Sequence, residues 1–393
     1  MFLPLSDAPN PGGRPLVTYA LIAANLLVYL LVSLPLGGEP PNPQDPAVRA
    51  YVELIRDRLP DGVPIGAILR RLSAYDIFVF QHGYKPIAPQ VSDLFASLFL
   101  HGGLMHLVGN MLFLWIYGDN VEYRLGRLRF LLWYLATGIA ATLFFSLFSP
   151  GSAVPLVGAS GAISGVLGFY FLWFPRNTIR VFVFLFPFFM NVVAVPARIV
   201  LGAFLLVDNL LPFLFAGDGR GGVAYGAHIG GFLTGLGAAW VMDRRVLAAR
   251  PRSYPTTADD QGPPSTIGES IARGDMAGAA HAYFAIAGDQ TRRAVEPDAA
   301  LALANWLAGQ GHTEAALVAY RRLLRDFPTG TTAAAAHVGT GLVQFEQLGQ
   351  VAPAYQHFLD ALDLNPDAQT AARARVALAS IAALQKLNVR RRS

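Results

Sequence analysis

The sequence predicts an all-α protein in two parts: a polytopic membrane bundle of six transmembrane helices and, after it, a soluble α-helical repeat domain. Three observations lead to this fold class. Only 14% of the 393 residues are charged, against about 25% in a typical soluble domain. Charge-free stretches of about 20 residues, long enough to cross a hydrocarbon core, recur along the first part of the chain. Beyond them, glycine, aromatic and proline residues repeat every 37 to 38 positions.

The composition also restricts the chemistry. The chain has no cysteine, which excludes disulfides, thiol catalysis and thiolate metal sites. Its net charge of +4 is modest, and the arginines stand beside apolar stretches, so a nucleic-acid surface is not indicated. The first apolar stretch lacks a basic leader and a small-residue cleavage site, so we expect a retained span rather than a signal peptide.

Five apolar stretches are assigned to six spans. The longest of them, at 130–175, holds no charge and is too long for one helix, and the Ser-Pro-Gly-Ser sequence at 149–152 divides it in two. The long loop after the first span is amphipathic and is expected to lie on the membrane surface. The predicted spans are 15–35, 94–118, the two halves of 130–175, 201–216 and 221–242.

Arginines decide the orientation. With six spans, the short loops on one side hold only Arg220, and the other arginines near the spans fall on the opposite side. Positive residues favour the cytoplasmic side, which predicts a multi-pass protein of the inner or plasma membrane with both termini cytoplasmic. The Phe-rich stretch 181–197 is either a short span or an interfacial segment. A seventh span would move Arg244 and Arg245 outside, so six is the better count.

Two domains joined by a linker follow from the change in composition: a membrane domain at 1–250, a Pro-rich linker at 251–266 and a helical domain at 267–393. In the last, a glycine precedes an aromatic residue by nine positions three times, and two prolines lie 38 apart. This pattern resembles tetratricopeptide repeats with a lengthened period, and a generic helical bundle is the alternative. The domain shows no site-like constellation, so we expect it to bind an unidentified protein partner. The recurring residues are Gly274 and Tyr283, Gly311 and Tyr320, Gly349 and Phe358, with Pro328 and Pro366.

Polar residues inside apolar spans are costly, and each needs a reason. The second span carries His101, His106 and Asn110, the fourth opens at Ser160, and the sixth carries His228. With a cytoplasmic N-terminus, these three helices all run from outside to inside. The polar groups therefore converge in the outer half of the bilayer.

The residue types indicate nucleophilic catalysis. A serine hydroxyl needs an adjacent base, and His228 is the natural base for Ser160. His106 and Asn110 are four residues apart on one helical face and can donate hydrogen bonds to an oxyanion, with the Ser160 amide as a third donor. His101 lies on a different face and is expected to support a loop or a water path. The sequence therefore predicts an active site that faces outward.

Glycines are expected to support this site. Gly231 and Gly235 form a G-x-x-x-G sequence on the sixth span, and Gly158 and Gly161 flank the predicted nucleophile. Small residues let two membrane helices approach closely, which would bring Ser160 within hydrogen-bond reach of His228. Asp208 is a carboxylate in the fifth span, and we assign it no role.

Three blocks of sequence carry a family resemblance. They are HGGLMHLVGNMLFLWIYGDNVEYRLGRLRF at 101–130, GASGAISGVLG at 158–168 and AHIGGFLTG at 227–235. In this order, and on the second, fourth and sixth helices, they resemble the rhomboid family of intramembrane serine proteases. The resemblance covers 91–243. It also matches Glu122, Arg124 and Gly126 to a turn whose role in the family is structural.

The resemblance implies a Ser160–His228 dyad without an acid, oxyanion roles for His106, Asn110 and the Ser160 amide, and no metal or cofactor. It implies cleavage of single-pass membrane proteins near the outer membrane face, after small residues and before helix-weakening ones. Some members stack an aromatic residue on the base, at a position that is Ser164 here, which leaves the imidazole to be oriented by another group.

Two other function classes stay open. The first is a catalytically inactive relative that only binds membrane proteins, although such proteins usually lose the serine or the histidine. The second is a transporter or channel that uses the membrane histidines as a proton relay. A zinc site is disfavoured because the sequence has no H-E-x-x-H and no carboxylate close to its membrane histidines.

Overall fold

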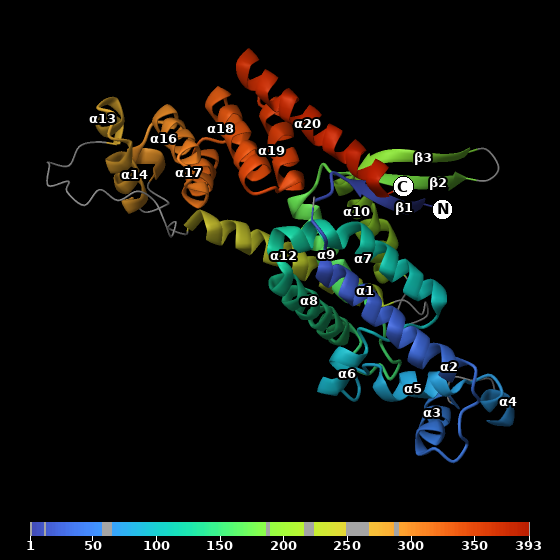
Figure 1. Cartoon of the computed structure of the whole chain (residues 1–393). Helices are drawn as coiled ribbons and strands as arrows, with labels where there is room; N and C mark the ends of the chain where they lie inside the picture. The colour runs from blue at the N-terminus through green and yellow to red at the C-terminus, as the bar shows by residue number, and fades with distance from the viewer. Residues whose placement is uncertain are drawn as a thin grey trace. The chain divides into compact units, whose positions relative to one another are not determined.

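The described part of the chain is mostly helical and contains one small β-sheet (Figure 1). The computed structural model describes residues 2–11, 13–56, 65–185, 189–215, 224–248, 267–286 and 291–392. These residues form two compact units, each described by itself below. The predicted linker at 251–266 lies outside the described residues. The first unit comprises Met1–Asp7, Gly13–Pro175 and Ile179–Ala239, and the second Ala8–Gly12, Arg176–Thr178 and Trp240–Ser393.

Helices lie at all six predicted span positions. Among the described residues, three are long and apolar enough to cross a membrane: Leu16–Gly37, Arg127–Phe148 and Ala197–Phe215. The chain therefore has the helices of a membrane protein, and the count of six spans stays a prediction. In order the helices are α1 (Leu16–Val28) with η1 (Tyr29–Ser33) and α2 (Leu34–Gly37), α7 (Leu104–Leu125), α8 (Arg127–Phe148), α9 (Ser160–Trp173), α10 (Ala197–Leu205) with η2 (Leu206–Leu210) and α11 (Leu211–Phe215), and α12 (Tyr225–Ala248).

The helix of the second span begins later than predicted. Residues 94–118 were expected to form one helix, but the short helix α6 (Val91–Ala96) ends before α7 begins at Leu104. Gly103 separates the two with φ +152°, which a glycine adopts readily. The described residues of the loop between α2 and α6 form three more short helices, α3 (Pro46–Arg56), α4 (Ile65–Leu69) and α5 (Ala74–His82).

A three-stranded sheet makes the all-α prediction wrong in one place. Its strands are β1 (Phe2–Ala8), β2 (Thr178–Leu185) and β3 (Phe189–Pro196), in the order β1-β2-β3. The described residues of the segment 181–197, which was expected as a span or an interfacial segment, thus lie almost entirely in two strands. Its runs of valine and phenylalanine are as favourable in a sheet as in a bilayer, so apolarity alone could not separate the two outcomes.

A buried carboxylate connects α7 to the start of α1. The Glu122 side chain accepts hydrogen bonds from the backbone N–H groups of Val17 at 3.0 Å and Thr18 at 2.7 Å. These amides belong to the first turn of α1, where backbone donors have no partner within the helix. Gly126 follows α7 with φ +79°, and the Arg124 guanidinium lies 4.2 Å from the centre of the Trp173 ring. These contacts give the three residues the structural setting that the resemblance implies.

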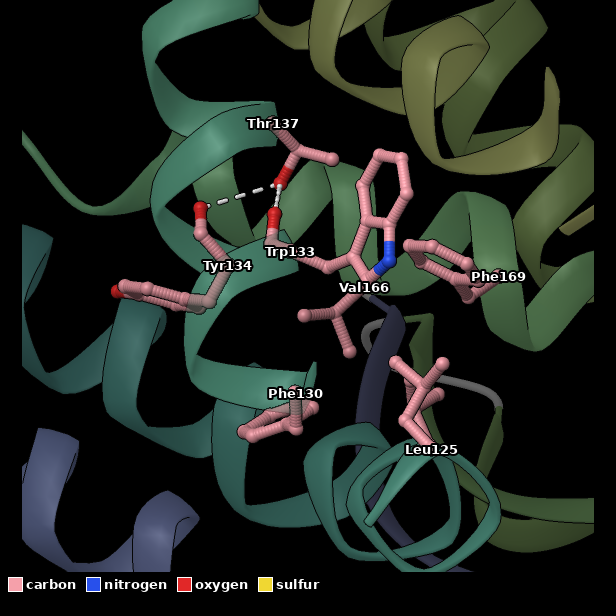
Figure 2. A pocket seen from close by; sticks show the side chains of 8 residues that line it. Leu125, Phe130, Trp133, Tyr134, Thr137, Val166 and Phe169 are labelled. Atoms are coloured by element: carbon pink, nitrogen blue, oxygen red, sulfur yellow. Dashed lines mark hydrogen bonds between the residues drawn. The ribbon is translucent and has the colours of Figure 1, made fainter. Parts of the chain in front are cut away.

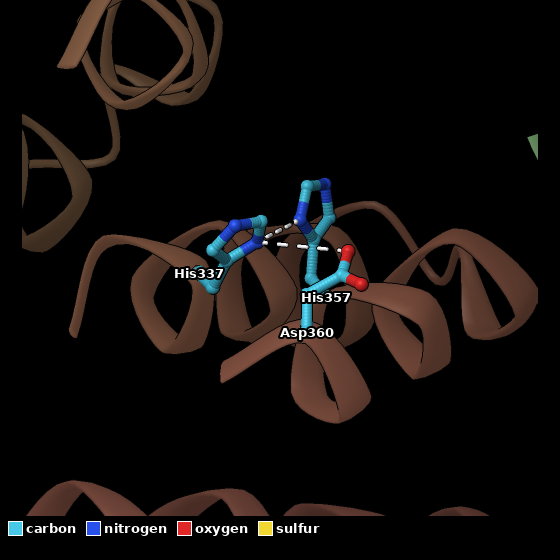
Figure 3. A group of neighbouring side chains, drawn as sticks. All are labelled: His337, His357 and Asp360. Atoms are coloured by element: carbon cyan, nitrogen blue, oxygen red, sulfur yellow. Dashed lines mark hydrogen bonds and ion pairs between the residues drawn. The ribbon is translucent and has the colours of Figure 1, made fainter. Parts of the chain in front are cut away.

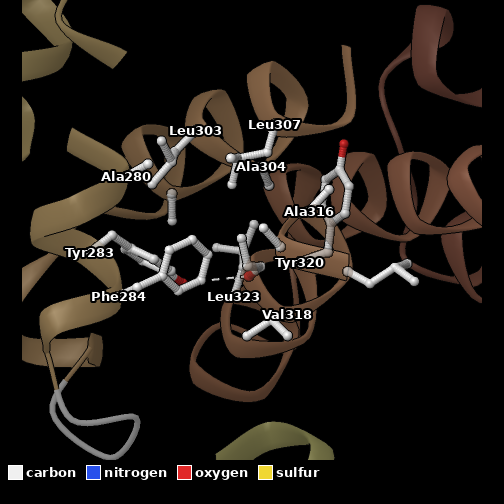
Figure 4. Close-up of a cluster of buried hydrophobic side chains, with 14 of the residues drawn as sticks. Ala280, Tyr283, Phe284, Leu303, Ala304, Leu307, Ala316, Val318, Tyr320 and Leu323 are labelled. Carbon is white, nitrogen blue, oxygen red and sulfur yellow. Dashed lines mark hydrogen bonds between the residues drawn. The ribbon is translucent and has the colours of Figure 1, made fainter. Parts of the chain in front are cut away.

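The second unit is a series of helices joined by short turns. Gly274, Gly311 and Gly349 occupy these turns with φ of +80°, +76° and +64°. The aromatic residues nine positions after them are buried, and Figure 4 shows two of the three, Tyr283 and Tyr320, in one cluster. The helical pattern is therefore present, and its identity as tetratricopeptide repeats stays a proposal. The helices are α13 (Ile267–Ala272), α14 (Met276–Ala285), α15 (Thr291–Ala294), α16 (Pro297–Gly309), α17 (Thr313–Asp326), α18 (Thr331–Leu342) with η3 (Val343–Gln347), α19 (Val351–Asp363) and α20 (Ala368–Arg392).

Candidate active site

Ser160 is presented by a tight turn at the N-terminus of α9. Gly158, two residues earlier, has φ +123° and donates its backbone N–H to the Ser97 carbonyl at 2.8 Å. A Cβ atom at Gly158 would lie 2.8 Å from Cε1 of His106, so a side chain at this position would collide with the imidazole. Glycine is therefore required here both for its backbone conformation and for space.

Glycines also set the distance between α9 and α12. A Cβ atom at Gly231 would lie 2.1 Å from the Gly161 carbonyl oxygen, and one at Gly235 would lie 2.0 Å from that of Gly165. The two pairs are spaced four residues apart on both helices, so one face of α12 rests directly on the backbone of α9. Small residues at such spacing permit this approach.

The close packing brings the predicted nucleophile and base together. His228 lies in the first turn of α12, and its Nε2 atom is 2.8 Å from Oγ of Ser160. Both side chains are half-buried. The two residues are 68 positions apart in sequence and come from different helices, yet they are hydrogen-bonded.

A residue that the sequence analysis missed completes the arrangement. Asn209 lies in the π-helical turn η2, and its Oδ1 atom is 2.7 Å from Nδ1 of His228. Its side chain is 1% exposed. The same turn contains Asp208, the carboxylate to which the sequence assigned no role. Asp208 is exposed, and it is the adjacent Asn209 that faces His228. The signal in the sequence was a pair of polar residues, Asp208 and Asn209, in an apolar span, and only the charged residue of the pair was considered.

The residues predicted to stabilise an oxyanion lie on α7. Asn110 is buried, and its Nδ2 atom has no hydrogen-bond partner among the described residues. His106 is exposed, and its Nδ1 atom accepts the backbone N–H of Gly102 at 3.4 Å. That bond leaves the Nε2 atom to carry the proton of a neutral ring, and a Cβ atom at Gly158 would lie only 2.9 Å from it. His106 thus offers a side-chain donor beside the turn before Ser160, and Asn110 offers a second, four residues further along α7.

His101 supports this region. It is fully buried, and its backbone carbonyl and N–H both bond the Tyr75 hydroxyl, at 2.9 and 3.1 Å. Its ring meets the His106 ring edge-on, with centroids 5.2 Å apart. Ser164 is buried on α9, where its short side chain offers the base no stacking surface.

A small hollow between helices of the first unit is closed by packed side chains. The side chains around it come from α7, α8 and α9 (Figure 2), and it is too small to hold a water molecule. Its only non-aromatic polar member, Thr137, donates its hydroxyl to backbone carbonyls of α8. We therefore interpret it as part of the helix interface. The lining residues are Val121, Leu125, Phe130, Trp133, Tyr134, Thr137, Val166 and Phe169.

One cluster in the second unit has metal-binding residue types. The ligand-type atoms of His337, His357 and Asp360 all lie within 4.8 Å of one another (Figure 3). The two imidazole Nδ1 atoms are 2.9 Å apart, and the Asp360 carboxylate is 2.9 Å from the Arg176 guanidinium. Burial, with the charge of Arg176, lowers the pKa of His337 to about 4. A guanidinium at this distance repels a divalent cation, so we assign the cluster to ion pairing and not to a metal.

Comparison with known proteins finds a domain family that matches the region containing Ser160 and His228. Residues 88–245 match the Rhomboid domain family. "Rhomboid protein 1, mitochondrial" of Saccharomyces cerevisiae is 34% identical over 167 residues, which are 41% of this chain and 44% of that protein. "Rhomboid protease GluP" of Bacillus subtilis is 48% identical over 75 residues, 19% of this chain and 14% of that protein. "Rhomboid-related protein 2" of Mus musculus is 26% identical over 219 residues, 50% and 69% of the two chains.

These matches support a relationship between the matched region and the rhomboid family. The chain spans less than half the length of the yeast and Bacillus relatives that it matches. The matched rhomboid region contains the blocks singled out in the sequence, including Ser160 and His228, and it also contains Asn209. The rhomboid family and the apolar helices together support a membrane protein.

Proposed function

We propose that this chain is an intramembrane serine endopeptidase that hydrolyses peptide bonds in or near transmembrane segments of membrane proteins. The observation that carries the proposal is the 2.8 Å contact between Ser160 Oγ and His228 Nε2. A hydroxyl bonded to a neutral imidazole is the arrangement that activates serine for attack on a carbonyl. The match of the surrounding region to the Rhomboid domain family adds to this, because one matched relative is named a protease.

In the proposed mechanism, Ser160 Oγ attacks the carbonyl carbon of the scissile bond while His228 Nε2 takes the hydroxyl proton. The tetrahedral oxyanion would accept hydrogen bonds from Asn110 Nδ2, His106 Nε2 and the Ser160 backbone N–H. The last of these donors stands at the N-terminus of α9, where the helix dipole adds positive potential. His228 then gives its proton to the leaving amine. Water hydrolyses the acyl-enzyme with the same imidazole as base.

The geometry also supports the choice of donors. Asn110 Nδ2 is a buried amide without a hydrogen-bond partner among the described residues, and such a group is costly unless a ligand supplies the acceptor. His106 presents its protonated nitrogen because its other nitrogen accepts from Gly102. No metal or cofactor enters any step of this scheme.

The remaining parts of the proposal concern location and partners. The substrates would be single-pass transmembrane proteins, reached within the lipid bilayer and cut near the extracytoplasmic face. Six spans would place both termini in the cytoplasm, with the second unit there as a tetratricopeptide-like scaffold for an unidentified protein partner.

Labelling of the purified full-length protein with a fluorophosphonate probe in detergent tests the nucleophile and base together. We expect labelling of the wild type and loss of labelling in Ser160→Ala and His228→Ala. Ser164→Ala is the matched control, because it removes a buried serine one turn further along α9, and it should label normally. Cleavage of a transmembrane substrate in liposomes should follow the same pattern. A wild type that neither labels nor cleaves would favour the inactive, membrane-protein-binding alternative.

A further inference from the structure

Asn209 makes two hydrogen bonds that together determine which way its amide faces. Its Nδ2 atom donates to the Phe204 backbone carbonyl at 2.8 Å, and its Oδ1 atom lies 2.7 Å from Nδ1 of His228. A backbone carbonyl can only accept, so the amide nitrogen must face Phe204. The amide oxygen is therefore the atom that faces the imidazole.

The orientation of the amide dictates the tautomer of the histidine. An amide oxygen can only accept, so His228 must carry a proton on Nδ1 to form the 2.7 Å contact. In a neutral ring, Nε2 then has the free lone pair, and this atom is the one that lies 2.8 Å from Ser160 Oγ. A chain of hydrogen bonds thus runs from the Ser160 hydroxyl through His228 and Asn209 to the Phe204 carbonyl.

We infer that Asn209 is a positioning residue for the base: its side-chain oxygen holds His228 in the Nδ1–H tautomer and aims Nε2 at the Ser160 hydroxyl. The inference rests on the proposed function for its catalytic consequence. In this inference, a neutral amide on the fifth apolar segment orients the His228 imidazole. An acid or a stacked aromatic ring would otherwise fill that role. Asn209 acts through His228, and its burial at 1% exposure keeps it away from substrate.

The local backbone explains how a short side chain reaches the imidazole. Asn209 lies in the π-helical turn η2, between the α-helical segments α10 and α11. Such turns shift the register of a helix locally and frequently occur at functional sites. As a result the buried face of this segment presents the amide, while Asp208 next to it is exposed.

The test compares two substitutions that differ in one property. Asn209→Leu has similar size and no acceptor, whereas Asn209→Asp keeps an oxygen toward Nδ1 and, as a carboxylate, cannot donate to Phe204. We expect Asn209→Leu to lower kcat for a transmembrane substrate about 10- to 100-fold, the effect of losing one hydrogen bond to a group that becomes charged. KM should change little. Asn209→Asp should recover most of the lost kcat.

This pair separates positioning from support of the fold. If Asn209 mattered only by bonding Phe204, Asp would be as harmful as Leu, and that result would overturn the inference. Asn25→Leu is the control, because Asn25 is another fully buried asparagine whose Nδ2 bonds a backbone carbonyl within its own helix, at 2.8 Å, without contacting the site. It should retain the wild-type kcat.

A second measurement needs no substrate, so it tests the inference even if the proposed function is wrong. In protein labelled with ¹⁵N at histidine, the shifts of His228, assigned by their loss in His228→Ala, should report the Nδ1–H tautomer. Asn209→Leu should convert them to a mixture of tautomers. An Nε2–H tautomer in the wild type would refute the inference whether or not the protein cleaves anything. Inactivity with the Nδ1–H tautomer present would count against the peptidase proposal alone.

Discussion

Replacing Gly231 by alanine should separate the two helices that carry the nucleophile and the base. The new Cβ atom would lie 2.1 Å from the Gly161 carbonyl oxygen, whereas carbon–oxygen contacts between packed backbones are about 3.3 Å or longer. The helices must therefore move apart by about 1.2 Å at this point. Backbone lies on both sides of the contact, so no flexible side chain can yield instead.

That displacement is large relative to the geometry of the site. Gly231 is less than one turn from His228, and Gly161 is adjacent to Ser160, so most of the movement reaches the 2.8 Å contact between base and nucleophile. An increase of this size exceeds the range of a hydrogen bond. General-base assistance contributes about 10²- to 10⁴-fold to such reactions, and we expect kcat/KM to fall at least about 100-fold. Overpacking should also cost about 1–3 kcal/mol of stability.

The assay measures kcat/KM in liposomes, probe labelling in detergent, and the thermal midpoint of unfolding for the same preparations. Gly237→Ala is the matched control on the same helix, because Gly237 is exposed and has no neighbouring atom within 4 Å of an added Cβ. It should leave activity unchanged and raise the midpoint slightly, since alanine stabilises helices relative to glycine. Wild-type activity and stability in Gly231→Ala would refute the close packing of α9 on α12.

Three further substitutions test the structure around the site and in the second unit. Glu122→Gln should cost about 1–3 kcal/mol, because it removes charge-assisted bonds to the first turn of α1, and an unchanged thermal midpoint would contradict that capping. Gly311→Ala should destabilise the second unit by about 1–2 kcal/mol, because Gly311 has φ +76°. Gly309→Ala is the control and should not destabilise it. Hydrogen exchange measures the protection of the second unit in both variants, and equal protection would argue against strain at the turn. Arg176→Ala removes the cation beside Asp360, so zinc should bind this variant more tightly than the wild type in calorimetry. The gain should vanish when His357→Ala is added, and equal zinc affinity with and without Arg176 would refute its exclusion of metal.

The residues of the candidate site were largely predictable because of where polar groups stand in an apolar chain. A serine and a histidine in separate spans have no structural reason to be there, so their pairing could be proposed from type and depth alone. The 2.8 Å contact agrees with that expectation. The glycine spacing likewise predicted a close helix approach, and a Cβ atom added at Gly231 or Gly235 would lie 2.1 or 2.0 Å from a carbonyl oxygen of α9.

Composition does not predict the structure of a segment when one composition suits two kinds of structure. Valine- and phenylalanine-rich stretches suit a span, an interfacial segment or a strand, and only pairing with β1 decided for a sheet at β2 and β3. The helix α7 starts at Leu104 because Gly103 adopts φ +152°, a conformation that hydropathy does not encode. Neither feature leaves a periodic signal in the chain.

What the chain alone settled is which chemistry is possible: apolar spans exclude most polar residues, so the few that remain identify a hydroxyl, an imidazole and amide donors as candidates for a site. Tertiary structure alone decided which of two adjacent polar residues, Asp208 or Asn209, faces His228. The choice depends on the helical phase of one turn, and the π-helical register of η2 sets that phase locally. A rotation of roughly 100° per residue separates neighbours on a helix, and so the residue that orients the base is visible only once the helices are packed.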